Sequence, residues 1–182
     1  MCFMKLSALA EENGFSQWAA ADMAALVPRQ EVRDMCSADR CGRWNNNWAC
    51  PPACGDLSAA AAAIGGFSAG ILLQTTGTLE DDFDYETMED IQRRHKRSFT
   101  DFARQARLLV GESLPLSAGS CTVCRRCTYP DRPCRFPQKR FSSMEAFGLL
   151  VSDVCLRSGL QYNYGARTMT YTSCLLYNRE VK

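Results

Sequence analysis

The sequence predicts an α+β protein, a small β-sheet flanked by helices, with two irregular cysteine-rich loops. Two segments rich in apolar and β-branched residues, 69–76 and 169–177, are typical of buried strands. Residues 85–110 lie between them and have the periodicity of a long amphipathic helix. Eight of the eleven cysteines fall into two compact groups, which indicates metal binding.

The first part of the chain, residues 1–33, is predicted to be a helical N-terminal segment of a single domain that spans residues 1–182. A chain of 182 residues, 46% hydrophobic and 23% charged, has the size and composition of one globular domain. Leu6 and Leu9 have helical spacing, and Gly14 marks a break.

A short alanine-rich helix is predicted at 59–64, after the first cysteine loop. Ser58 is its expected N-cap, and the glycine pair at 65–66 ends it. The strand predicted at 69–76 follows.

The long helix predicted at 85–110 begins after Asp84, a suitable N-cap, and closes at Gly111. Its apolar stripe includes Phe99 and the single histidine, His95. We expect His95 to be a buried core residue, because a histidine on an apolar helix face usually satisfies its nitrogens inside the protein.

The C-terminal third contains the second cysteine loop, at 119–137, and two short helical segments, at 143–147 and 152–158. The strand predicted at 169–177 is the last element of the chain. We expect the helix at 85–110 to cover the sheet and the two cysteine loops to lie close together at one end.

Several classes of protein are disfavoured by the composition. No apolar run is long enough to span a bilayer, and the start of the chain has no convincing signal-peptide cleavage site. The odd number of cysteines and their tight clustering disfavour a disulfide scaffold. The formal charge of the chain is +1 with all thiols neutral. Two bound iron–sulfur clusters, each with four thiolates and a charge of about −2, would change it to about −3, which leaves no basic field for nucleic acid. We therefore expect a cytoplasmic protein that binds neither membrane nor nucleic acid.

The first cysteine group lies in an irregular segment rich in glycine, asparagine and proline. It consists of Cys36, Cys41, Cys50 and Cys54. Pro51 follows the third thiol directly, and a proline in this position removes a backbone donor and helps to cover a cluster. The looser spacing of this group is also compatible with a zinc knuckle or with free thiols.

The second group has a more specific spacing. It consists of Cys121, Cys124, Cys127 and Cys134. Three thiols at intervals of three residues commonly wrap three corners of a cubane iron–sulfur cluster, whereas structural zinc sites usually use two separated C-x-x-C pairs. The spacing resembles that of bacterial ferredoxins, in which the last cysteine can ligate the other cluster. Cys134 is therefore assigned to the second group by proximity alone.

Basic residues surround the second group. They are Arg125, Arg126, Arg132, Arg135, Lys139 and Arg140. They could compensate the charge of a buried anionic cluster, or form a docking surface for an acidic electron donor or a pocket for an anionic ligand.

Three longer motifs are CGRWNNNWACPPACG at 41–55, LPLSAGSCTVCRRCTYPDRPCRFP at 114–137 and SSMEAFGLLVSDVC at 142–155. Over about residues 14–176 the chain resembles a prokaryotic family of predicted metal-binding proteins, domain-of-unknown-function family 2284. The resemblance implies iron–sulfur or other metal binding, occurrence mainly in anaerobes, and no established reaction.

The resemblance also implies ligand roles for Cys36, Cys41 and Cys50 and for all four cysteines of the second group. Cys54 is less firmly part of the implied set. We expect it to complete the ligands of the first cluster; otherwise one iron keeps an open position.

The predicted function is that of an iron–sulfur protein with two [4Fe-4S] clusters that transfers electrons to a redox partner protein. An open iron at the first cluster could instead act as a Lewis acid, as in a small reductase or a sulfur-handling enzyme. Zinc held by the same thiols would make a structural protein.

Overall fold

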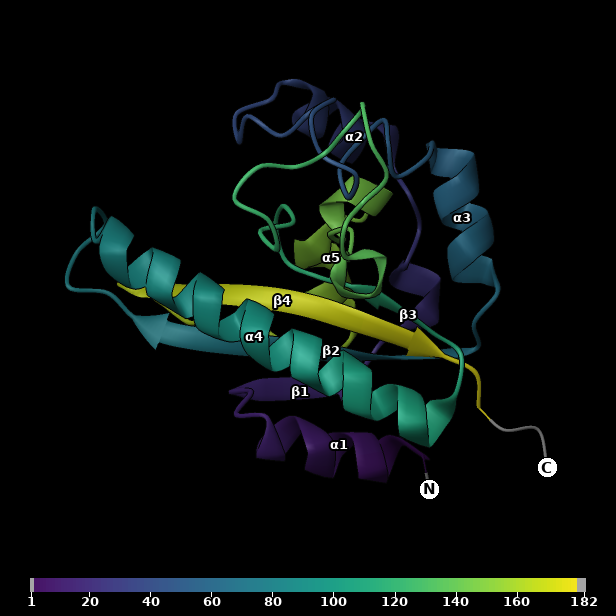
Figure 1. Cartoon of the computed structure of the whole chain (residues 1–182). Helices are drawn as coiled ribbons and strands as arrows, with labels where there is room; N and C mark the ends of the chain where they lie inside the picture. Colours follow the sequence, from purple (N-terminus) through teal and green to yellow (C-terminus); the bar gives the residue numbers. More distant parts are fainter. Residues whose placement is uncertain (1, 180–182) are drawn as a thin grey trace.

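A four-stranded antiparallel sheet with helices on both faces forms the protein in the computed structural model, which describes residues 2–179 (Figure 1). The α+β prediction is therefore confirmed. The strands are β1 (Gln17–Ala20), β2 (Ala69–Thr78), β3 (Ser113–Leu116) and β4 (Thr168–Tyr177), in the order β1-β2-β4-β3. The helices of the described residues are α1 (Cys2–Glu12), α2 (Gln30–Ser37), α3 (Leu57–Gly65), α4 (Tyr85–Val110) and α5 (Val151–Arg157), with short 3₁₀ turns η1 (Met23–Ala25), η2 (Pro137–Lys139) and η3 (Glu145–Phe147).

The two strands predicted from the sequence form the centre of the sheet. β2 and β4 pair along their whole length, from Ala69 opposite Tyr177 to Thr78 opposite Thr168. Successive side chains of a strand point to opposite faces, so this pair contributes apolar side chains to both faces of the sheet.

One face of the sheet is covered by α1 and α4. Ile71 and Leu73 of β2 and Leu175 of β4 pack there against Phe99 and Phe102 of α4, and all five side chains are fully buried. Leu6, Leu9 and Ala10 of α1 complete this core. The prediction that the long helix covers the sheet is confirmed.

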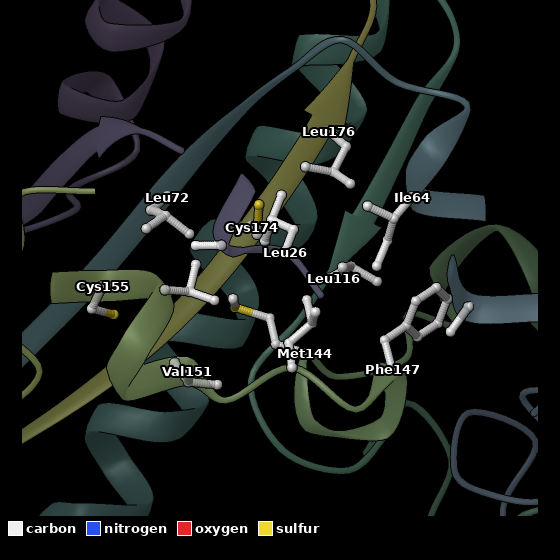
Figure 2. Close-up of a cluster of buried hydrophobic side chains, with 14 of the residues drawn as sticks. Leu26, Ile64, Leu72, Leu116, Met144, Phe147, Val151, Cys155, Cys174 and Leu176 are labelled. Carbon is white, nitrogen blue, oxygen red and sulfur yellow. The ribbon is translucent and has the colours of Figure 1, made fainter. Parts of the chain in front are cut away.

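The opposite face packs against the short helices and turns that carry the cysteine loops. Leu72, Cys174 and Leu176 project from this face toward Met144 and Val151 (Figure 2). Cys155 and Cys174 are fully buried in this core. The turn η3 is held in this core through Phe147.

The long helix begins and ends where the sequence predicts. The side chain of Asp84 accepts a hydrogen bond from the backbone amide of Thr87 at 3.1 Å, and Gly111 follows the last turn with a φ of 73°. Gly77 of β2 lets α4 approach closely, because a Cβ at this position would collide with Ile91.

His95 is a buried core residue, as predicted. Its Nδ1 lies 2.8 Å from the hydroxyl of Thr75 on β2, and its Nε2 lies 2.7 Å from the hydroxyl of Ser173 on β4. Burial lowers the pKa of His95 to about 3, so the imidazole is neutral.

The structure differs from the prediction at three places. Residues 1–33 are not helical throughout, because Gln17–Ala20 forms the edge strand β1. Its sequence, QWAA, has little intrinsic strand preference, so its pairing with β2 decides its conformation. Ser113–Leu116 forms the other edge strand, β3, which was not predicted. The N-cap of α3 is Asp56, whose carboxylate accepts from the amide of Ala59 at 2.8 Å, and not Ser58.

Among residues 2–179, no helix combines the length and the apolar character needed to cross a bilayer.

Candidate metal centre

The first cysteine group begins at the last turn of α2 and continues through a chain of tight turns. Cys36 lies on α2, Cys41 is exposed on the following turn, and Cys50 is buried. The backbone amide of Cys54 donates to the carbonyl oxygen of Cys50 at 3.2 Å, which folds the last two cysteines of the group onto one turn. The carboxamide oxygen of Asn47 accepts from the amide of Ala49 at 2.9 Å and fixes the approach to Cys50.

The four thiols of this group lie within electrostatic range of one another. Burial, together with the nearby thiols of Cys41, Cys54 and Cys36, raises the pKa of Cys50 to about 12. Burial also raises the pKa of Cys36, and Cys41 and Cys54 add to this effect. Burial therefore favours the protonated form of Cys36 and Cys50, and a bound metal would deprotonate them directly.

The turn η3 lies behind the first group. The thiol of Cys36 donates to the carbonyl oxygen of Glu145 at 3.8 Å, and the thiol of Cys54 donates to the carbonyl oxygen of Ala146 at 3.7 Å. Two thiols far apart in the sequence from this turn are thus held against its backbone.

A buried guanidinium also lies beside these thiols. Arg33 is 8% exposed, and its Nη1 donates to the carbonyl oxygen of Gly55 at 2.8 Å. Its Nε and Nη2 are buried and have no hydrogen-bond partner in the described part of the chain. The positive charge of Arg33 opposes the upward shift in the pKa of Cys36 and of Cys54.

Glu145 is a half-buried ionisable residue at this site. Its Oε2 is buried without a hydrogen-bond partner among residues 2–179, and burial raises the pKa of its carboxyl group. Glu145 also raises the pKa of Cys36, whereas Lys96 lowers that of Glu145. Arg33, Glu145 and Lys96 therefore surround the first group with ionisable side chains.

The second group lies on a loop braced by its own backbone. The hydroxyl of Thr128 donates to the carbonyl oxygen of Pro133 at 2.9 Å, and Arg135 Nη1 donates to that of Arg126 at 3.0 Å. Its four cysteines are all half-buried. Burial raises the pKa of Cys121, and Cys134 and Cys124 raise it further, so Cys134 lies in electrostatic range of its own group.

The two cysteine segments are packed against each other. Asn47 Nδ2 donates to the carbonyl oxygen of Cys121 at 3.3 Å, and Trp48 Nε1 donates to that of Arg132 at 3.0 Å. The rings of Trp48 and Tyr129 meet edge to face with centroids 4.9 Å apart. Tyr129 also donates to the carboxamide oxygen of Asn45 at 2.9 Å. The expectation that the two loops lie close together is confirmed, and Figure 1 shows both on the side of the sheet that carries α2 and α5.

The thiols of the described residues do not converge on a single metal position. Among residues 2–179, no three His, Cys, Asp or Glu side chains converge tightly enough to hold a single metal ion. The basic residues of the second loop are mostly exposed; they are Arg125, Arg126, Arg132, Arg135 and Lys139, whereas Arg140 is half-buried.

Sequence reasoning missed Arg33, Glu145 and Lys96. Arg33 precedes Cys36 by three residues on one helix, a spacing that places two side chains on the same face. That spacing was a usable signal for Arg33, whereas Glu145 and Lys96 reach the cysteines only through the tertiary fold.

Comparison with known proteins identifies one family. The family model described as predicted metal-binding protein (DUF2284) matches residues 20–177, and the chain belongs to this family. No curated protein and no solved structure matches the chain significantly. The resemblance noted in the sequence is thereby confirmed, and the family description supports metal binding without specifying the metal.

Proposed function

We propose that this member of the DUF2284 family is an iron–sulfur protein with two [4Fe-4S] clusters, one at each cysteine group, that transfers electrons to a redox partner in the cytoplasm. The observation that carries the proposal is the packing of two four-thiol groups against each other, with a buried, incompletely paired guanidinium beside the first. The candidate ligands are Cys36, Cys41, Cys50, Cys54, Cys121, Cys124, Cys127 and Cys134.

The charge of the surroundings supports an anionic centre at the first group. A buried, unpaired charge is costly, and an opposite charge nearby offsets the cost. Four thiolates on a cubane leave a charge of about −2, which would satisfy the two unpaired nitrogens of Arg33. The raised pKa of Glu145 favours the neutral form of its carboxyl group, which would limit its repulsion of such an anion.

The choice of iron over zinc rests on the spacing of the second group, in which three thiols follow at intervals of three residues. When bound, such clusters exchange single electrons. The residues of the chain then have two tasks, to exclude water and to hold the two centres close together. Asn47 and Trp48 serve the second task through their hydrogen bonds to the other loop.

The exposed arginines of the second loop support docking of an acidic redox partner. Arg125, Arg126 and Arg132 are exposed. Complementary charge on a partner would speed its association and orient it toward the second group.

One observation favours an enzyme as the second candidate. Cys54 lines a cavity of about 570 Å³, together with Arg140 and Phe147. If Cys54 does not ligate, the first cluster has an iron with an open position. A substrate in this cavity could bind to that iron, which would act as a Lewis acid.

Purification without oxygen, followed by counting of metals and sulfide, tests the proposal. We expect about eight iron and about eight sulfide per chain, and an electron paramagnetic resonance signal after reduction. Stoichiometric zinc without iron would contradict the proposal.

A Cys54→Ser variant then separates the two candidates, with Cys2→Ser as the matched control outside both groups. An electron carrier with Cys54 as a ligand should lose or damage one cluster. If both clusters survive with their signals unchanged, the site is already open and the enzyme is favoured.

A further inference from the structure

A second cavity, of about 960 Å³, lies between α4 and the two cysteine loops. Its volume is that of a pocket for a metabolite-sized ligand. One cysteine of each group, Cys41 and Cys121, lies in its wall. A ligand in this cavity would therefore contact both candidate metal-binding loops at once.

The wall carries five cationic side chains from three separate parts of the chain. They are Arg43, Arg93, Lys96, Arg97 and Lys139. Two carboxylates, Glu89 and Asp101, line the same cavity. The cavity therefore has a surplus of positive charge.

The two carboxylates already have basic partners. Glu89 lies 3.6 Å from Arg93, which also pairs with Asp90, and Asp101 lies 3.7 Å from Arg104 outside the cavity wall. Within the described residues, Arg43, Lys96, Arg97 and Lys139 form no ion pair with a carboxylate. Four cationic groups of the wall thus remain available to a ligand.

Lys96 is the most firmly positioned of the four. It is half-buried on α4, and its Nζ donates to the carbonyl oxygen of Ser120, next to Cys121. That bond uses one of three N–H groups of the ammonium, so two remain for another acceptor. Arg97 follows it on the helix, and Arg43 comes from the first cysteine loop.

We propose that this cavity binds a small, multiply charged anion, a metabolite with phosphate or carboxylate groups, against both cysteine groups. Lys96 and Arg97 of α4, with Arg43 of the first cysteine loop, recognise the anionic groups. This proposal does not rest on electron transfer, and its test does not require that the bound metal be iron.

Calorimetric titration of the metal-loaded protein, kept free of oxygen, tests the proposal. The probes are inorganic phosphate, pyrophosphate and citrate, which separate phosphate from carboxylate recognition and single from multiple charge. We expect pyrophosphate or citrate to bind with 1:1 stoichiometry and more tightly than phosphate. Failure of all three probes to bind would overturn the proposal.

Variants then locate the site. Arg97→Gln and Arg43→Gln should each weaken binding about tenfold, the effect of one lost hydrogen bond to a charged group. Arg94→Gln is the matched control, because Arg94 is exposed on the same helix and does not line the cavity. An equal loss in Arg94→Gln would reveal unspecific attraction to the charged surface and overturn the proposal.

The metal content of the same variants separates this proposal from the proposed function. Arg97→Gln and Arg43→Gln should keep their metal while they lose anion affinity. Loss of metal without any change in anion affinity would show that these cations only compensate the charge of the centres, and would also overturn the site. If the protein purifies with stoichiometric zinc and no iron but still binds pyrophosphate or citrate, the iron–sulfur proposal is refuted and the anion site stands.

Discussion

Arg33 and Cys36 lie one turn apart on α2, and the buried guanidinium of Arg33 counteracts the rise in the pKa of the Cys36 thiol. Two nitrogens of Arg33 remain without partners in the described part of the chain. The guanidinium of Arg33 therefore places a positive charge from α2 beside the first cysteine group.

Replacing Arg33 by glutamine should therefore weaken the first centre. We expect metal affinity to fall about 10- to 100-fold, as for other residues that support metal ligands indirectly. The reduction potential of one cluster should also fall, because a positive charge beside an anionic cluster favours the reduced state. Metal counting and a redox titration followed by electron paramagnetic resonance measure both effects.

Two companion variants control this experiment. Arg33→Lys keeps the charge and should retain most of the potential, whereas Glu31→Gln alters an exposed residue of the same helix and should change nothing. Equal potentials in Arg33→Gln and the wild type would exclude a tuning role for Arg33.

Cys134→Ser tests whether the last cysteine serves its own group. Cys134 lies in electrostatic range of Cys121, so we expect loss of the second cluster only, with about half of the iron retained. Iron and sulfide counting with electron paramagnetic resonance of the reduced protein provides the measurement. Loss of the first cluster, with the second intact, would show that the ligands cross between the groups as they do in two-cluster ferredoxins.

His95 predicts a dependence of stability on pH. Its pKa is about 3 in the fold, against about 6.5 in the unfolded chain, so the unfolded state binds the proton more readily. Its contribution to stability is fully present above pH 6.5 and is lost as the pH falls toward 3, by about 1.4 kcal/mol per pH unit.

Urea unfolding at several pH values between 7.5 and 5, for the wild type and for His95→Gln, measures this effect. The difference between the two proteins isolates the contribution of His95 from that of the other titrating groups. If the free energy of unfolding changes with pH by the same amount in the two proteins, His95 is not the group that titrates.

The contact between Trp48 and Tyr129 should join the two loops energetically. Their rings meet edge to face, and such pairs contribute about 0.5–1.5 kcal/mol beyond their burial. A double-mutant cycle of Trp48→Ala and Tyr129→Ala, measured by urea unfolding, should give a coupling energy of this size. The distant pair Trp18→Ala and Tyr129→Ala should be additive, and a coupling as large in that pair would point to a global effect instead.

The sequence was most informative where local signals agreed. The helix Tyr85–Val110 has an N-cap, an amphipathic stripe and a closing glycine, and all three predicted the observed bounds. The edge strand Gln17–Ala20 carries no such agreement, because four residues without clear alternation acquire their conformation only by pairing with β2. Edge strands of this length depend on long-range contacts that a local pattern does not contain.

The candidate centre divides in the same way. The spacing of Cys121, Cys124 and Cys127 is a local signal and was visible in the sequence. Glu145 and Lys96 lie more than forty residues from Cys50 along the chain, and their approach to the first group depends on the packing of η3 and α4. Such a convergence is a property of the tertiary fold alone.

The two hydrophobic cores on either face of the sheet contain none of the eight candidate ligand thiols. Chelation should therefore strip the centres and leave the scaffold standing, unlike a zinc finger, which unfolds when it loses its ion. The apoprotein would then be folded before it binds metal, and the metal centres could be inserted after folding is complete.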